Sequence, residues 1–137
     1  MDEIFDNWNQ VKKKTHKNQR KLGIKSREIF WLKIGQNIGS EEYGKDLEFV
    51  RPVIIVKQLT NDLFIGIPTT TAKKENNDYF HNIKYFDKNQ NEITSSAMIC
   101  QFRTFSKKRL LYKIGKINEI EFKEILEKLK RIIDPTC

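Results

Sequence analysis

With 137 residues, 38% of them hydrophobic and 32% charged, the chain suits one globular domain, and its composition excludes a disordered protein. Its formal net charge of +8 indicates a polyanionic partner. No apolar run approaches the roughly 20 residues that cross a bilayer, and the acidic start MDEIFDNWNQ is unlike a signal peptide, so we expect a cytoplasmic protein with no membrane partner.

Residues 1–26 are predicted to form an N-terminal helical and basic extension. Ile4, Trp8 and Val11 are spaced as one apolar stripe of a short helix. A basic run without any acid follows, made of Lys12, Lys13, Lys14, Lys17, Arg20, Lys21, Lys25 and Arg27. Two interpretations stay open: a solvated linker behind a packing helix, or an arm that contacts nucleic-acid phosphates.

Residues 27–137 are predicted to form the folded domain, in which short apolar segments alternate with turn residues. The pattern predicts strands at 28–34, 52–58, 63–69, 80–86, 95–102 and, shorter, 110–114. Apolar residues at helical spacing then predict one C-terminal helix, which begins at a capping box of Asn118 and Glu121 and ends at Asp134-Pro135. Several short strands with one terminal helix indicate a mainly β, α+β domain: a small barrel that the helix closes or backs.

The cysteines and histidines are too few, and too far apart in the sequence, to form a metal site. We expect Cys100 to be a small buried hydrophobe, and His16 and His81 to lie on the surface. Neither GxGxxG nor GxxxxGK[ST] occurs, which argues against a bound nucleotide. We therefore expect no metal and no cofactor.

Polar residues gather at the predicted strand ends. Pro52 restrains Arg51 to an extended conformation at the start of the second strand, and the third strand runs into Thr69, Thr70 and Thr71. Lys73 and Lys74 follow. A guanidinium that grips two phosphate oxygens, together with hydroxyl and ammonium donors, suits a phosphodiester.

Five segments in this order resemble the MazF/PemK family of toxins from type II toxin–antitoxin systems. They are REIFWLKIGQNIGSEE, RPVIIVKQ, GIPTTT, CQFRTFSKKRLLYKIG and the C-terminal helix. The resemblance covers about Arg27 to Ile133. It implies an SH3-like barrel, usually a homodimer, and an endoribonuclease that cuts single-stranded RNA at short sequence motifs. It also implies a cognate antitoxin whose acidic, flexible tail fills the RNA groove.

By the same resemblance, Arg51 matches the family's catalytic arginine and Thr69 its active-site threonine. Ser40 and Glu41 match loop residues that support the site, and Gln101 and Arg103 match a segment near the RNA groove. With these, we expect Thr70, Thr71, Lys73 and Lys74 to bind RNA. Two features depart from the family pattern: the loop at 43–50 is longer than usual, and Met98 and Cys100 stand where some members carry Arg and Asp.

The resemblance implies a metal-free reaction in which the ribose 2′-OH attacks the phosphorus and leaves a 2′,3′-cyclic phosphate. Arg51 would stabilise the developing charge, but a guanidinium is a poor general base. Glu41 is our candidate for the base; otherwise it orients Arg51. The alternative for Arg51 is an ion pair with Asp46 or Glu48, and the alternative for Thr69 is a turn hydroxyl.

Two rival functions stay open. The first is a barrel without nuclease activity, like the gyrase-poisoning CcdB toxins, which acts by binding a protein. The second is a basic nucleic-acid-binding module without catalysis. Tyr79 and Phe80 are available for base stacking if they do not belong to the core.

Overall fold

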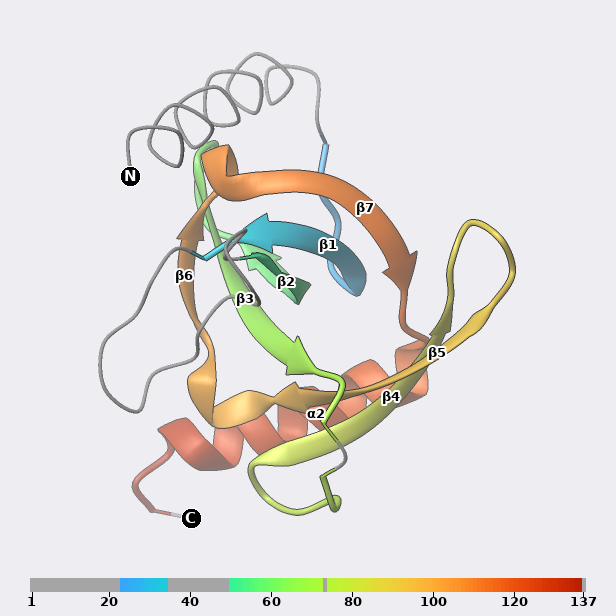
Figure 1. Ribbon diagram of the computed structural model, residues 1–137. Coiled ribbons are helices and arrows are strands. Elements are labelled where there is room, and N and C mark those ends of the chain that lie inside the picture. The colour runs from blue at the N-terminus through green and yellow to red at the C-terminus, as the bar shows by residue number, and fades with distance from the viewer. Residues whose placement is uncertain (1–22, 35–49, 73, 137) are drawn as a thin grey trace, which may run out of the picture.

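The computed structural model describes residues 23–34, 50–72 and 74–136. Its backbone is a strongly curved antiparallel sheet with one long helix packed against it (Figure 1). The strands are β1 (Glu28–Lys33), β2 (Val50–Gln58), β3 (Leu63–Thr70), β4 (Phe80–Phe86), β5 (Glu92–Met98), β6 (Arg103–Ser106) and β7 (Leu110–Lys116). Two single 3₁₀ turns, η2 (Ile99–Gln101) and η3 (Lys107–Arg109), flank β6, and the helix is α2 (Glu119–Ile133).

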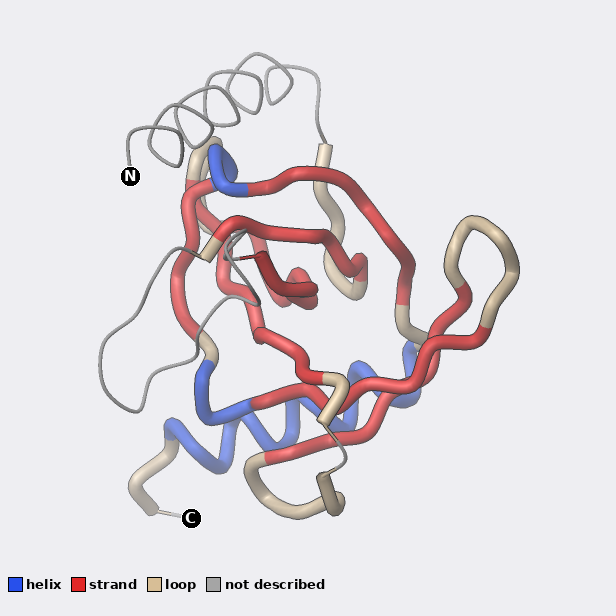
Figure 2. The backbone as a smooth tube through the Cα atoms, in the orientation of Figure 1, coloured by secondary structure: helices blue, strands red, loops and turns tan. Residues whose placement is uncertain are grey.

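The strands follow the order β4-β5-β3-β2-β1-β7, with β6 paired to β3 outside this path. β3 pairs with three strands: residues 64–68 pair with β2, residues 63–66 pair with β6 on the other side, and its last two residues, Thr69 and Thr70, pair with β5. The tube in Figure 2 shows the sheet curling around on itself. The pairings among the described residues do not close it, so the small barrel expected from the sequence is corrected to a curved open sheet, which α2 backs.

The helix begins as the sequence predicts, but only half of the expected capping box forms. The Asn118 side chain accepts a hydrogen bond from the Glu121 amide at 2.8 Å. The Glu121 carboxylate bonds instead to the backbone of Lys84 on β4. Since β4 is an edge strand, this side chain ties the first turn of α2 to the open edge of the sheet.

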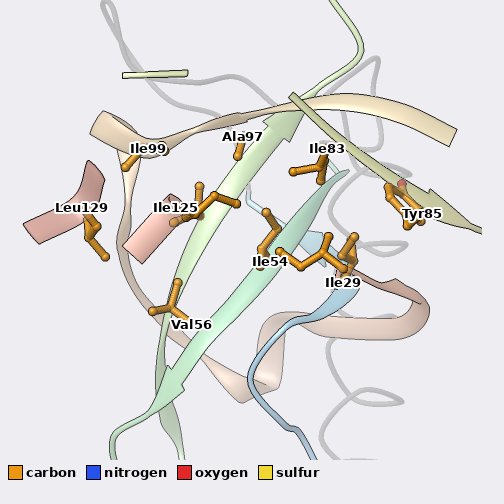
Figure 3. Close-up of a cluster of buried hydrophobic side chains, with 11 residues drawn as sticks. Ile29, Ile54, Val56, Ile83, Tyr85, Ala97, Ile99, Ile125 and Leu129 are labelled. Carbon is orange, nitrogen blue, oxygen red and sulfur yellow. The ribbon is translucent and has the colours of Figure 1, made fainter. Parts of the chain in front are cut away.

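Two hydrophobic cores lie on opposite faces of the sheet. The helix core lies between the sheet and α2, as Figure 3 shows, and includes Ile29, Ile54, Ile67, Ile83, Ala97, Ile125 and Leu129. The sheet core fills the inside of the curl and includes Phe30, Leu32, Val53, Ile55, Phe64, Phe105 and Leu110. Neighbouring residues such as Val53 and Ile54 belong to different cores because side chains alternate between the two faces of a strand. This alternation explains why β2 is apolar along most of its length.

The predicted strands at 28–34, 52–58, 63–69, 80–86 and 110–114 and the C-terminal helix are confirmed, with ends that differ by a few residues. The prediction for 95–102 is wrong at its end, because the chain leaves β5 after Met98 and turns through η2. β6 is a strand that the sequence analysis missed. Only four residues long, it carries a single buried apolar side chain, Phe105, and therefore shows no alternating pattern.

The predicted extension at 1–26 lies mostly outside the described residues, and its helix stays a prediction. In the described part of the chain, no helix is both long and apolar enough to span a membrane.

Candidate active site

Arg51 and Thr69, which lie where β2 begins and β3 ends, are joined by two hydrogen bonds. The Arg51 Nη1 donates to the Thr69 carbonyl at 3.0 Å, and the Thr69 Oγ1 donates to the Pro52 carbonyl at 3.1 Å. Both side chains are deeply buried: Arg51 is 5% exposed and Thr69 1% exposed. The guanidinium is thus held against the end of β3 rather than extended into solvent.

The two side chains nevertheless leave their strands on opposite faces. Arg51 alternates with Val53 and Ile55, which belong to the sheet core, whereas Thr69 follows Ile67 on the face of the helix core. A long side chain lets Arg51 reach the Thr69 backbone from its own face. The only proton of the Thr69 hydroxyl is donated to Pro52, so in this geometry the hydroxyl offers a ligand an acceptor but no donor.

Cross-strand register identifies the residues that do share the face of Arg51. Arg51 pairs with Leu32 of β1, and the β2/β3 register continued from Val53 and Pro68 sets Thr70 opposite Arg51. Thr70 pairs with Ser96 of β5, and Ser96 pairs with Asn82 of β4. We call Arg51, Thr70 and Ser96 the polar row, because residues directly opposite in an antiparallel sheet point to the same side.

Ser96 is a candidate that sequence reasoning missed. It is 1% exposed, and its Oγ has no hydrogen-bond partner in the described part of the chain. The sequence offers only two consecutive serines in a predicted strand. Register alone distinguishes them: Ser95 faces Tyr85 and the helix core, and Ser96 faces the polar row.

The last residue of β3 is partly accessible, and the described residues that follow it lie at the surface. Thr70 is half-buried, and its Oγ1 accepts a hydrogen bond from the Ala72 amide at 3.2 Å. Thr71 and Lys74 are exposed. The Lys74 ammonium lies 5.5 Å from the centre of the half-buried Phe80 ring, and Tyr79 is 53% exposed. An aromatic side chain and a cation therefore border the end of β3.

Gln101 and Arg103 lie on η2 and β6, the elements that follow β5. Gln101 ends η2 and is half-buried, while Arg103 is exposed on β6 with its guanidinium carbon 5.0 Å from the centre of the Phe105 ring. Arg103 pairs with Gly66, three residues before Thr69, which is roughly 10 Å along β3. Arg103 therefore lies outside the region where Arg51 meets Thr69.

Several predicted residues fall outside the described part of the chain: Ser40, Glu41 and Lys73, and also Asp46, Glu48 and His16. The described residues bring together no group of three or more His, Cys, Asp or Glu side chains that could hold a metal ion.

Two expectations about single residues were wrong. His81 is buried, 5% exposed, between β4 and α2, with its Nδ1 3.0 Å from the Lys128 ammonium and its Nε2 3.2 Å from the Glu124 carboxylate. Burial, with the nearby Lys128 charge, lowers the pKa of His81, and Glu124 opposes this shift in part. Cys100 is exposed, because η2 turns it out of the apolar stretch in which it lies.

The sequence of residues 25–133 matches the family model described as PemK-like, MazF-like toxin of type II toxin-antitoxin system. This match covers most of the chain. The chain belongs to the PemK/MazF toxin family. Comparison with curated protein sequences gives no match.

Solved structures agree with this PemK/MazF assignment at the level of the fold. One is an endoribonuclease in complex with its cognate antitoxin from Mycobacterial species, with a TM-score of 0.61, 12% identity, and 81% of this chain and 95% of that chain covered. Another is MazE-MazF from Deinococcus radiodurans, with a TM-score of 0.57, 11% identity, and 82% and 96% covered. This PemK/MazF chain therefore carries its family's fold on a very divergent sequence.

Proposed function

We propose that this toxin is an endoribonuclease that cleaves single-stranded RNA, mRNA included, at short sequence motifs without a metal ion. The observation that carries the proposal is the Arg51 guanidinium, buried and fixed on the Thr69 carbonyl at the end of β3. The chain belongs to a family of toxins, and Arg51, in the segment RPV, matches the catalytic arginine of that family by sequence resemblance. One solved structure of similar fold is an endoribonuclease.

RNA supplies its own nucleophile, so the protein has to hold the 2′-OH in line with the phosphorus and to stabilise the charge of the pentavalent intermediate. The products are a 2′,3′-cyclic phosphate and a free 5′-OH. Arg51 suits the stabilising role, because a guanidinium stays charged and offers several N–H donors from a position set before the substrate arrives. Glu41 stays our candidate for the general base.

The hydrogen bonds of Thr69 favour a positioning role for this residue. Its carbonyl holds the guanidinium of Arg51, and its hydroxyl holds the carbonyl of Pro52, the residue next to Arg51. Thr69 thus holds two consecutive residues at the start of β2, Arg51 through its carbonyl and Pro52 through its hydroxyl. A hydrogen bond from its hydroxyl to the phosphate would require the bond to Pro52 to break.

We propose that RNA continues from Arg51 over the end of β3 to Thr70, Thr71 and Lys74, whose ammonium lies over the Phe80 ring, and to the exposed Tyr79. Ser40 and Lys73 belong to the same proposed surface. Gln101 and Arg103 would contact nucleotides farther along the strand. Since backbone phosphates supply most of such binding, affinity should fall steeply as salt is added.

We also propose that the toxin works in the cytoplasm as a homodimer and that a cognate antitoxin neutralises it through an acidic flexible tail. A net charge of +8 suits such a tail. Both similar solved structures named above are complexes of a toxin with its antitoxin.

The test is cleavage of a long RNA in excess EDTA by the wild type, Arg51→Ala and Arg131→Ala. Arg131 is an exposed arginine of α2 and serves as the matched control. Removing one preorganised donor typically lowers a rate by about 10²–10³-fold, so Arg51→Ala should cut at least that much more slowly, with Arg131→Ala close to the wild type. Products should carry a 2′,3′-cyclic phosphate.

Equal cleavage by Arg51→Ala and the wild type would refute the assignment of Arg51. Tight RNA binding by the wild type without any cut would favour a nucleic-acid-binding module. Intact RNA without binding would favour a CcdB-like toxin that acts on a protein.

A further inference from the structure

The Ser96 hydroxyl on β5 is buried, and no described residue forms a hydrogen bond with it. Ser96 is 1% exposed, and its Oγ has no partner among the described residues. A buried hydroxyl without a partner has lost its bonds to water and gained none in return, so it is costly to the folded state, and folded proteins contain few of them. Such a group is a candidate for a ligand contact.

The direction of the Ser96 side chain follows from its neighbours. Figure 3 shows Ala97 on the side of Ile54 and Ile125, within the helix core. Ser95 faces the same core, where it hydrogen-bonds Tyr85. Since successive side chains of a strand alternate, Ser96 points to the other face of β5.

On that face Ser96 belongs to the polar row. Thr70 stands directly opposite Ser96 on β3, and Arg51 comes next on β2 by the continued register. Two strand spacings separate the backbones of β2 and β5, roughly 10 Å. The bond from Arg51 to the Thr69 carbonyl brings the guanidinium to β3, and thus toward β5.

The chemistry of the polar row favours an anion with several oxygens. The row offers a guanidinium and two hydroxyls, and neither its members nor the residues that end it, Leu32 and Asn82, carry a carboxylate. The Thr70 hydroxyl already accepts the Ala72 amide, which leaves its proton to be donated. A tetrahedral phosphate can accept from all three groups at once.

We propose that Ser96 donates a hydrogen bond to a non-bridging phosphate oxygen of the bound RNA, beside Thr70 and Arg51. That the phosphate belongs to RNA rests on the proposed nuclease function. Ser96 transfers no proton and forms no covalent bond in this role. The hydrogen bond from the Ser96 hydroxyl to the phosphate strengthens as negative charge grows on the phosphate oxygens during the attack.

The experiment compares Ser96→Ala with Ser95→Ala, a matched control: the same residue type, next in the chain, also buried in the same strand, but directed to the other face. Three quantities are measured in the full chain: the cleavage rate of an RNA, the Kd of the same RNA with a 2′-deoxy nucleotide at the cut site, and the urea midpoint of unfolding. Ser96→Cys, which keeps the volume of the side chain and weakens the donor, is the second variant.

A hydrogen bond to a charged group suggests that Ser96→Ala loses about 10- to 100-fold in cleavage rate and several-fold in Kd. Its urea midpoint should be unchanged or higher, because the unsatisfied hydroxyl is gone. Ser95→Ala should show the reverse: a lower midpoint after loss of the bond to Tyr85, and wild-type cleavage per folded molecule. Ser96→Cys should fall between the wild type and Ser96→Ala.

Wild-type cleavage and Kd in Ser96→Ala would overturn the proposal. So would equal losses of activity in the two variants that track their losses of stability, since Ser96 would then be structural only. If the wild type cuts no RNA, the nuclease proposal fails on its own, and the Kd of the 2′-deoxy RNA still decides whether Ser96 contacts phosphate.

Discussion

Ile125 of α2 offers a direct test of how the helix holds the sheet. Its side chain is fully buried in the helix core, on the helix face that packs against β2 and β5. Ile125→Ala removes three carbons from a site with no solvent contact. The loss of transfer free energy and the cavity left behind together cost about 2–5 kcal/mol. That is a large part of the roughly 5–15 kcal/mol by which a domain is stable.

The matched control is Ile120→Ala in the first turn of the same helix, where the side chain is 72% exposed. There the same substitution should change the free energy of unfolding by less than about 0.5 kcal/mol, and alanine's better helix propensity even favours the variant. Urea unfolding followed by circular dichroism gives both values. Ile125→Ala should lower the midpoint strongly without changing the slope, which would show that compactness is kept. Equal midpoints for the two variants would refute the packing of α2 described above.

Two further predictions concern buried contacts. The folded state lowers the pKa of His81 below its ordinary 6.5, so as the pH falls through 6.5 the unfolded state takes up a proton that the folded state does not yet bind. Stability should therefore be complete above about pH 6.5 and decline below it, and urea midpoints at pH 7.5 and 5.5 should differ less in His81→Gln than in the wild type. Gly115→Ala would place a methyl 2.5 Å from the Tyr85 ring, so overpacking should cost about 1–3 kcal/mol in thermal unfolding. Gly23→Ala, where no described residue lies within 4 Å of the added methyl, should be neutral. Unchanged pH dependence in His81→Gln, or equal melting of the two glycine variants, would contradict these accounts.

The elements that the sequence predicted well are those whose pattern depends on local physics. β4 was predicted at both ends, because its side chains alternate between buried and exposed along the whole strand. The helix followed from its apolar spacing and from the Asn118 cap. In contrast, residues 95–102 contain the apolar run 97–100 and look like a single strand, and nothing in the segment marks the turn at η2 that exposes Cys100.

His81 was misplaced for a different reason. Its position in the alternation of β4 puts it on the face of Ile83 and Tyr85, and the pattern alone predicts an inward side chain. A histidine at a strand start is usually solvated, and His81 is buried because its ring has polar partners on another element. Those partners, Glu124 and Lys128, lie more than forty residues away, on a helix whose rotation about its axis no local pattern reveals.

The candidate site also depends on tertiary contacts that no local sequence pattern reveals. The resemblance brought Arg51 and Thr69 together, and their strands do meet. Which hydroxyl shares the face of the guanidinium depends on register, and a slip of one residue between β2 and β3 would exchange Thr70 for Thr69. That register depends on the connection at 59–62, where the Thr60 hydroxyl accepts from the Asp62 and Leu63 amides, and on the register shift of β2 between Ile55 and Lys57. The same counting along β5 separates Ser96 from Ser95, so the polar row is a property of strand pairing, and its residues acquire their chemistry only once the sheet has formed.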